Sequence, residues 1–129
     1  MRTIPAALLL GLVLLAGPPA ASGAERITIA AHELRKAFAD DQGAAEARYL
    51  GKTVLVKGIV LSTGMSKYLT PTILLSEREG GPVQVICVLP RLDAGKLSDF
   101  KPGQSVTMSG RVYRLSENGV VLKECKAVD

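Results

Sequence analysis

Two cysteines, Cys87 and Cys125, are the side chains of this chain best suited to covalent chemistry. An even, isolated pair of cysteines tends to close into a disulfide when the chain reaches an oxidising compartment. A redox-active pair is one alternative, but the close Cys-x-x-Cys spacing that lowers a thiol pKa is missing. The pattern therefore predicts a structural disulfide, worth ~4 kcal/mol in the chain-entropy model, with two free buried thiols as the other alternative.

The other candidates for chemistry lack suitable partners. His32 is the only histidine, and it has Glu33 and more distant acids near it in sequence, which is too few ligands for a metal site. Ser62, Ser66 and Ser98 have no basic residue at a spacing that would form a nucleophile–base pair. We therefore predict a protein that is not an enzyme, with no catalytic residues, no metal and no cofactor.

Residues 1–24 have the pattern of a cleavable export signal. Arg2 supplies a positive start, residues 6–16 are an unbroken apolar and small run, and residues 22–24 read Ser-Gly-Ala, a small-x-small cleavage pattern. We expect cleavage after Ala24 or nearby, so that the mature chain begins at Glu25. An uncleaved anchor is the alternative, but the run is shorter than the ~20 residues that a spanning helix needs. We therefore expect a periplasmic or secreted protein with no stable membrane anchor after cleavage.

The composition limits the mature chain, residues 25–129, to one small domain. The leader is richer in hydrophobic residues than the 47% of the whole chain, and aromatic residues make up only 4% of the chain. The core is therefore thin, and a disulfide would add needed stability. The net charge of +4 and the pI near 9.3 show mild basicity, because acidic residues are interspersed among the basic ones.

Hydrophobic periodicity divides the domain into a helical lead-in, residues 27–50, and a β-rich part, residues 53–125. In the lead-in Thr28 is a candidate N-cap, and the sequence around Gly43 allows two short helices or one long one. Five strands are predicted after it, at residues 53–62, 68–75, 83–89, 105–115 and 120–125. A short helix or irregular plug is expected at residues 90–101, with Leu92, Leu97 and Phe100 facing inward.

This order of elements predicts a mainly β fold with an N-terminal helix, namely a five-stranded OB-fold barrel. An SH3-like small barrel or a small sandwich is the alternative. Gly58 in the first strand indicates a bulge or tight coil, as a small barrel needs where a strand bends between two sheets. In an OB barrel strands three and five lie side by side and run in the same direction, which would place Cys87 and Cys125 on neighbouring strands.

Two segments follow a recurring glycine-and-valine pattern. The first is Tyr49-Leu50-Gly51-Lys52 followed by Val54, Val56 and Gly58, and the second runs from Lys101-Pro102-Gly103-Gln104 to Gly110. With the rest of residues 27–125, they resemble the bacterial tRNA-anticodon-binding-like OB-fold family of exported proteins and lipoproteins of unknown role. The resemblance implies an OB fold and export.

The chain departs from that family at two places. Ala30 stands where members often have serine or threonine ahead of the first helix, so the predicted helix start is less well defined. The lipid-accepting cysteine that many members carry is missing near the cut site. The second departure favours free release into the periplasm.

The expected function is that of a non-catalytic binding module. OB-folds bind ligands on the face of strands two and three and on the adjoining loops. The predicted binding surface therefore includes the loop at residues 62–67 and the side chains of Tyr68, Arg78, Gln84 and Asn118. The ligand that we expect is a protein, peptide or glycan of the cell envelope.

Single-stranded nucleic acid is the alternative ligand. Lys57, Arg111 and Lys123 share an apparent outward parity and form a candidate basic stripe. Nucleic-acid sites also need aromatic side chains on which bases stack, and only Tyr68 and Tyr113 lie on the predicted strands or their edges. The scarcity of aromatic residues and the predicted export therefore favour the envelope ligand.

Overall fold

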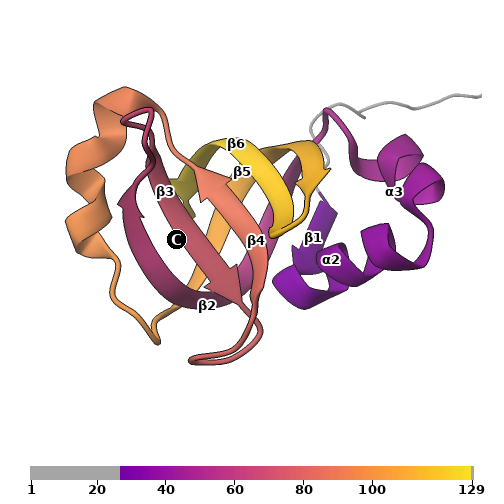
Figure 1. Cartoon of the computed structure of the whole chain (residues 1–129), viewed down its shortest axis with the longest axis horizontal. Coiled ribbons are helices and arrows are strands. Elements are labelled where there is room, and N and C mark those ends of the chain that lie inside the picture. Colours follow the sequence, from indigo (N-terminus) through magenta and orange to yellow (C-terminus); the bar gives the residue numbers. More distant parts are fainter. Residues whose placement is uncertain (1–26, 129) are drawn as a thin grey trace, which may run out of the picture.

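The computed structural model describes residues 27–128, and the predicted export signal lies outside this range. A short strand and two helices precede a β-barrel (Figure 1). The elements are β1 (Ile27–Ala30), α2 (Ala31–Asp40), α3 (Gln42–Tyr49), β2 (Thr53–Met65), β3 (Pro71–Ser76), β4 (Val83–Val88), the 3-10 helix η3 (Arg91–Asp99), β5 (Ser105–Ser116) and β6 (Gly119–Ala127). Within the described range, no helix is long and apolar enough to span a membrane.

The barrel consists of five strands in the order β2-β3-β4-β6-β5, and β5 pairs with β2 to close it. Strand β2 makes this closure because its first half pairs with β5 and its second half pairs with β3. Neighbouring barrel strands are antiparallel except β4 and β6, which run parallel. The arrangement is that of an OB-fold, which confirms the predicted fold class.

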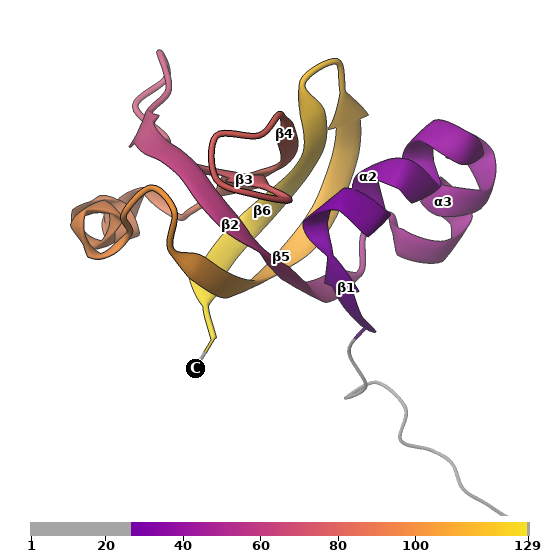
Figure 2. The ribbon, with the colours of Figure 1, turned by 90° about the horizontal axis from the view of Figure 1, so that it is seen from below.

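The inward-facing residues of the strands form the core, and α2 covers one side of the barrel. Buried and more exposed residues alternate along the strands, as their period of two requires. Leu34 and Phe38 of α2 are completely buried, and this helix contacts β2, β3, β4 and β6. Tyr49 of α3 packs beside Phe38, with ring centroids 6.4 Å apart. Figure 2 shows α2 and α3 on one side of the barrel and η3 on the opposite side.

Residues 27–30 form strand β1, so the prediction that the helical lead-in starts at Ile27 was wrong. The polar Thr28 stands between the apolar Ile27 and Ile29, and all three residues are β-branched, which suits a strand. Strand β2 offers them an edge, and β1 pairs with it in parallel along residues 54–57. The N-cap predicted at Thr28 is also wrong, because α2 begins after Ala30.

The lead-in contains two short helices, which separate at Asp41 rather than at Gly43. The carboxylate of Asp41 accepts a hydrogen bond from the backbone N–H of Ala44 at 3.1 Å, so Asp41 caps the N-terminus of α3. One turn of α2 carries an exposed ion pair of 2.7 Å between Lys36 and Asp40, and this contact raises the pKa of Lys36.

The boundaries of the first two barrel strands differ from the prediction. Strand β2 continues to Met65, beyond the loop that was expected to start at Ser62. Strand β3 starts only at Pro71, so Tyr68 lies in the loop at residues 66–70 rather than on a strand. Proline suits this first position because it cannot donate to the ladder of hydrogen bonds.

Gly58 allows close packing between β2 and the start of α2. A Cβ atom at this position would lie 3.2 Å from the Cβ of Leu75 and 3.3 Å from that of Ala31. The bulge that was predicted at Gly58 lies instead between Val60 and Ser62, where the register with β3 shifts. The glycine therefore serves the contact between helix and barrel.

The insert between β4 and β5 is the 3-10 helix η3 and a short turn. Leu97 and Phe100 are partly buried against the core, as predicted. Leu92 is 99% exposed, so the prediction that it faces inward was wrong. A 3-10 helix has three residues per turn, so Leu97 and Phe100 share a face that Leu92 does not reach.

Candidate ligand-binding groove

A groove of about 610 Å³ crosses the outer face of β3, β4, β6 and β5, beside the loop at residues 66–70. Its floor is apolar and includes Ile86 and Val88 of β4 and Val121 of β6. The hydroxyl-bearing residues Ser66, Thr70 and Thr72 line it toward β3. Because β4 and β6 are parallel neighbours, the floor lies across the seam between them.

Two tyrosines stand at the groove, each with a cation against its ring. The Nζ atom of Lys123 lies 3.8 Å from the ring centroid of Tyr113, and that of Lys67 lies 5.3 Å from the ring centroid of Tyr68. Tyr113 is 43% exposed and Tyr68 is 67% exposed. Each ring therefore offers an accessible aromatic surface beside a positive charge, an arrangement that cation–π attraction stabilises.

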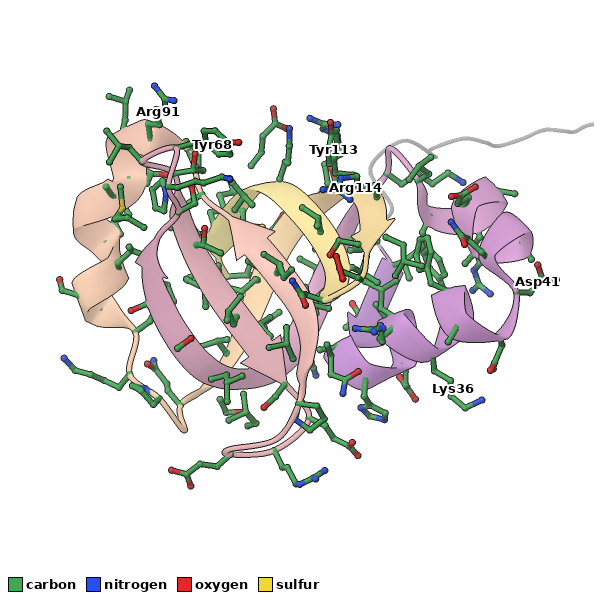
Figure 3. All side chains as sticks on the ribbon, in the orientation of Figure 1. Lys36, Asp41, Tyr68, Arg91, Tyr113 and Arg114 are labelled. Carbon is green, nitrogen blue, oxygen red and sulfur yellow. The ribbon has the colours of Figure 1, made fainter. Side chains whose placement is uncertain are left out.

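Three arginines add positive charge around the groove. Arg111 and Arg114 line it from β5, and the Nε of Arg111 donates to Oε1 of Glu124 at 3.2 Å. Arg91 of η3 donates from Nη2 to the carbonyl oxygen of Tyr68 at 3.2 Å. Figure 3 shows Tyr68 and Arg91 toward one end of this side of the barrel and Tyr113 and Arg114 toward the other. Basic side chains around the groove outnumber the acidic Glu124 in its lining.

Two β-bulges between β5 and β6 orient the residues of this face. At the bulge between Val112 and Arg114, β5 has one more residue than β6. The adjacent Tyr113 and Arg114 therefore both line the groove. Strict alternation after the buried Val112 would have turned Arg114 into the barrel. At the bulge between Ser109 and Arg111, β6 has the extra residue, and Glu124 of β6 adopts a left-handed φ of 56°.

The loop at residues 66–70 has a defined shape that presents Tyr68. The Oγ atom of Ser66 accepts hydrogen bonds from the backbone N–H groups of Tyr68 at 3.2 Å and Thr70 at 3.3 Å. Leu69 has a φ of 61°, which is unfavourable for a side chain of this size unless the surrounding contacts hold it. The hydrogen bond from Arg91 supplies one such contact, because it ties the loop to η3.

The structure brings together only part of the predicted basic stripe. Arg111 and Lys123 are direct neighbours across β5 and β6 and both line the groove. Lys57 has the outward parity of Arg111, but it lies opposite Thr107 and lines a separate hollow of about 410 Å³. Lys57 is therefore not part of this groove.

The predicted binding residues are also divided. Tyr68 lines the groove, whereas Asn118 lines a hollow of about 400 Å³ that adjoins it at Ile86. Arg78 lies in the exposed turn between β3 and β4, and Gln84 is half-buried near the start of β4. Neither Arg78 nor Gln84 is part of the groove lining.

Arg91 and Arg114 were not part of the predicted binding surface or of the basic stripe. Lys67 was included through the predicted loop at residues 62–67, and Tyr113 was considered only as a stacking residue for the alternative ligand. For Tyr113 a signal was present, because it alternates outward with Arg111 in the predicted strand at residues 105–115. For Arg114 the alternation pointed inward, and only the bulge brings it out. Arg91 joins the site through a hydrogen bond to Tyr68 that no sequence spacing indicates, whereas Lys67 directly precedes Tyr68 in the chain.

Other chemistry-bearing groups are not part of the groove lining. Cys87 and Cys125 are both buried and are free thiols in the structure, so the disulfide stays a prediction. His32 lies on α2. Across residues 27–128, no group of three or more potential metal ligands is clustered.

An OB barrel with an open groove on this face defines a binding module of the OB-fold class. Family comparison narrows this assignment: the tRNA_anti-like model matches residues 16–126, and the chain belongs to the tRNA_anti-like family. This confirms the resemblance seen in the sequence. A search of curated proteins found no match.

Two solved structures show the same fold. One is a "putative nucleic acid-binding lipoprotein" from Klebsiella pneumoniae subsp. pneumoniae MGH 78578, with a TM-score of 0.67, 17% identity, and coverage of 81% of this chain and 92% of that one. The other is a "putative aspartyl-tRNA synthetase" from Leishmania major Friedlin, with a TM-score of 0.53, 15% identity, and coverage of 81% of this chain and 21% of that one. At these identities the likeness concerns the fold alone.

Proposed function

We propose that this protein is an exported, non-catalytic OB-fold module that binds single-stranded nucleic acid in the groove. The observation that carries the proposal is the pairing of an exposed tyrosine with a cation at two places along one groove. Bases stack on aromatic faces while basic side chains bind the phosphates, so a single strand uses both features at once.

A bound strand would use the groups that the free groove already holds in pairs. A base stacks on Tyr113, and the ammonium group of Lys123, 3.8 Å from that ring, is close enough to meet the adjoining phosphate. Arg111 can exchange its exposed ion pair with Glu124 for a phosphate, because such pairs contribute little to stability. Tyr68 offers a second stacking surface near the other end.

The charge of the groove favours nucleic acid over the envelope protein, peptide or glycan expected from the sequence. That expectation depended on the scarcity of aromatic residues and on the predicted export. In the structure both exposed tyrosines and several basic side chains gather at this groove, which answers the first of these two grounds. By analogy of fold, the family name and the name of the Klebsiella protein point to the same ligand class.

Fluorescence anisotropy with labelled oligonucleotides of roughly 10–20 nucleotides tests the proposal. We expect micromolar or tighter binding at ~0.15 M salt, and contacts to about 3–5 phosphates give a slope of about −2 to −3.5 in log affinity against log salt. The chain has no tryptophan, so quenching of its tyrosine fluorescence reports stacking directly. Polyglutamate, which carries charge but no bases, is the control and should leave tyrosine fluorescence unchanged.

Absence of oligonucleotide binding even at low salt would overturn the nucleic-acid proposal. Quenching of equal size by polyglutamate would do the same, because the groove would then recognise charge alone. A titration that gives binding to an envelope peptide or glycan, and none to oligonucleotides, would restore the ligand expected from the sequence.

The export part of the proposal depends on residues 1–24, with their positive start and apolar run. In a bacterial host we expect the periplasmic fraction to contain a chain whose N-terminus is Glu25 or a nearby residue, as read by mass spectrometry. A variant that lacks the leader should stay in the cytosol as the control. Recovery of the intact full-length chain from the cytosol alone would contradict export.

A further inference from the structure

Cys87 and Cys125 lie where the seam between β4 and β6 opens. The two strands pair in parallel over three register positions, and the last position joins Cys87 to Leu122. Strand β4 then ends at Val88 and the chain continues to η3, while β6 follows β5 as far as Ala127. The two cysteines therefore occupy the end of the barrel's parallel seam.

An unusual backbone conformation turns Cys125 into the barrel. Leu122 is buried and Lys123 faces the groove, so strict alternation would leave Cys125 facing outward. The left-handed φ of 56° at Glu124 inserts an extra residue into β6, and Cys125 is completely buried as a result. A non-glycine residue adopts this conformation at a cost, so the contacts of the inward-facing Cys125 must compensate.

The surroundings of the sulfur atoms are fitted closely. A Cβ atom on Gly110 of β5 would lie 2.8 Å from the Sγ of Cys125, so only glycine leaves room for this sulfur. The Cys125 thiol also lies 3.5 Å from the carbonyl oxygen of Leu122. Cys87 is equally buried, and a hydrogen bond with the Cys125 side chain, together with burial, raises the pKa of Cys87 well above its usual value.

We infer that Cys87 and Cys125 are the site of a disulfide that closes the seam of the barrel beneath the groove. The oxidant is an external disulfide, either a small molecule or a thiol–disulfide exchange protein. The thiolate of one cysteine attacks it, forms a mixed disulfide and releases one thiol. The thiolate of the second cysteine then displaces the other thiol. Each cysteine loses its proton, and the two electrons reduce the oxidant to two thiols.

The bridge joins the two halves of the groove floor, because Val88 of β4 and Lys123 of β6 both line it. It also limits the freedom of the unfolded chain, since it closes a long loop. The raised pKa keeps the Cys87 thiolate scarce in the folded state, so exchange takes place while the chain folds or opens locally. Reaction of the reduced, folded protein with thiol reagents should accordingly accelerate as the pH rises.

Alkylation followed by mass spectrometry tests the bridge on the whole chain. The protein is incubated with glutathione disulfide and then unfolded in denaturant with iodoacetamide, with or without a reducing step. Without the reducing step we expect no label and a mass two hydrogen atoms below that of the dithiol form. After the reducing step we expect a label on both cysteines. Labelling of both thiols without reduction would overturn the inference.

Thermal unfolding supplies a second measurement. Reductant should lower the Tm of the oxidised protein by roughly 10–20 °C. The matched control is the double variant Cys87→Ala/Cys125→Ala, whose Tm should not respond to reductant. A wild-type Tm that is equal with and without reductant would contradict the bridge. Neither measurement involves an oligonucleotide, so the result is independent of the ligand proposed for the groove.

Discussion

Replacing Tyr113 with alanine is expected to weaken the binding of a single-stranded oligonucleotide by about 5- to 100-fold. Stacking of one base on an aromatic side chain contributes ~1–3 kcal/mol, and each 1.4 kcal/mol corresponds to about a tenfold change in Kd. Tyr113 is 43% exposed, so its removal should leave the fold intact. The charge of the groove is unchanged, so anisotropy titrations at several salt concentrations should show weaker binding with an unaltered salt slope.

Two companion variants separate stacking from charge. Tyr113→Phe keeps the ring and should bind almost as tightly as the wild-type protein. Lys123→Ala removes one cation and should reduce the salt slope by about 0.7, whereas Lys101→Ala, in the exposed turn before β5, should leave the slope unchanged. Wild-type affinity in the Tyr113→Ala variant would show that bases do not stack at this position.

Replacing Phe38 with alanine is expected to lower the free energy of unfolding by about 3–5 kcal/mol. The side chain is completely buried on α2, where the helix meets β2, β3, β4 and β6, and its ring packs beside that of Tyr49. Its removal leaves a cavity between α2 and the barrel, which the surrounding structure can fill only in part. Small domains have a total stability on the order of 5–15 kcal/mol, so the variant should unfold at much lower denaturant concentration.

The matched control for this cavity is Phe38→Leu. Leucine keeps much of the buried volume, so it should cost less than about 1.5 kcal/mol. Far-UV circular dichroism before the transition should show that both variants retain their helices and strands. A loss of less than about 1 kcal/mol in Phe38→Ala would mean that α2 unfolds separately from the barrel.

Much of the barrel could be predicted from the sequence because the fold buries one face of each strand. In the strand at residues 105–115, Met108 and Val112 alternate with more polar residues, and both are completely buried. Leu34 and Phe38 recur at helical spacing and are likewise buried, between α2 and the barrel. Such periods reflect interactions between a residue and its near neighbours in the chain, so the sequence displays them directly.

The site could be predicted only in part. Strand alternation in the sequence predicted that Arg111 and Lys123 face outward, and the structure pairs them across neighbouring strands. The same parity included Lys57, which lies on β2 opposite Thr107, away from Arg111, and lines a different hollow. Alternation assigns a side chain to a face of the sheet, but it does not say how far apart two side chains on that face will be.

The sequence alone therefore determined the presence and order of the five barrel strands and of a helical segment before them, and through these it favoured an OB barrel, because local burial patterns encode these elements. Only the tertiary structure decided that residues 27–30 form a strand, that Arg114 turns outward and that Tyr68 and Tyr113 share one groove. A free sheet edge, a bulge and a groove shared by separate strands and loops all depend on partners that are distant in the chain. These features form only once the barrel has closed.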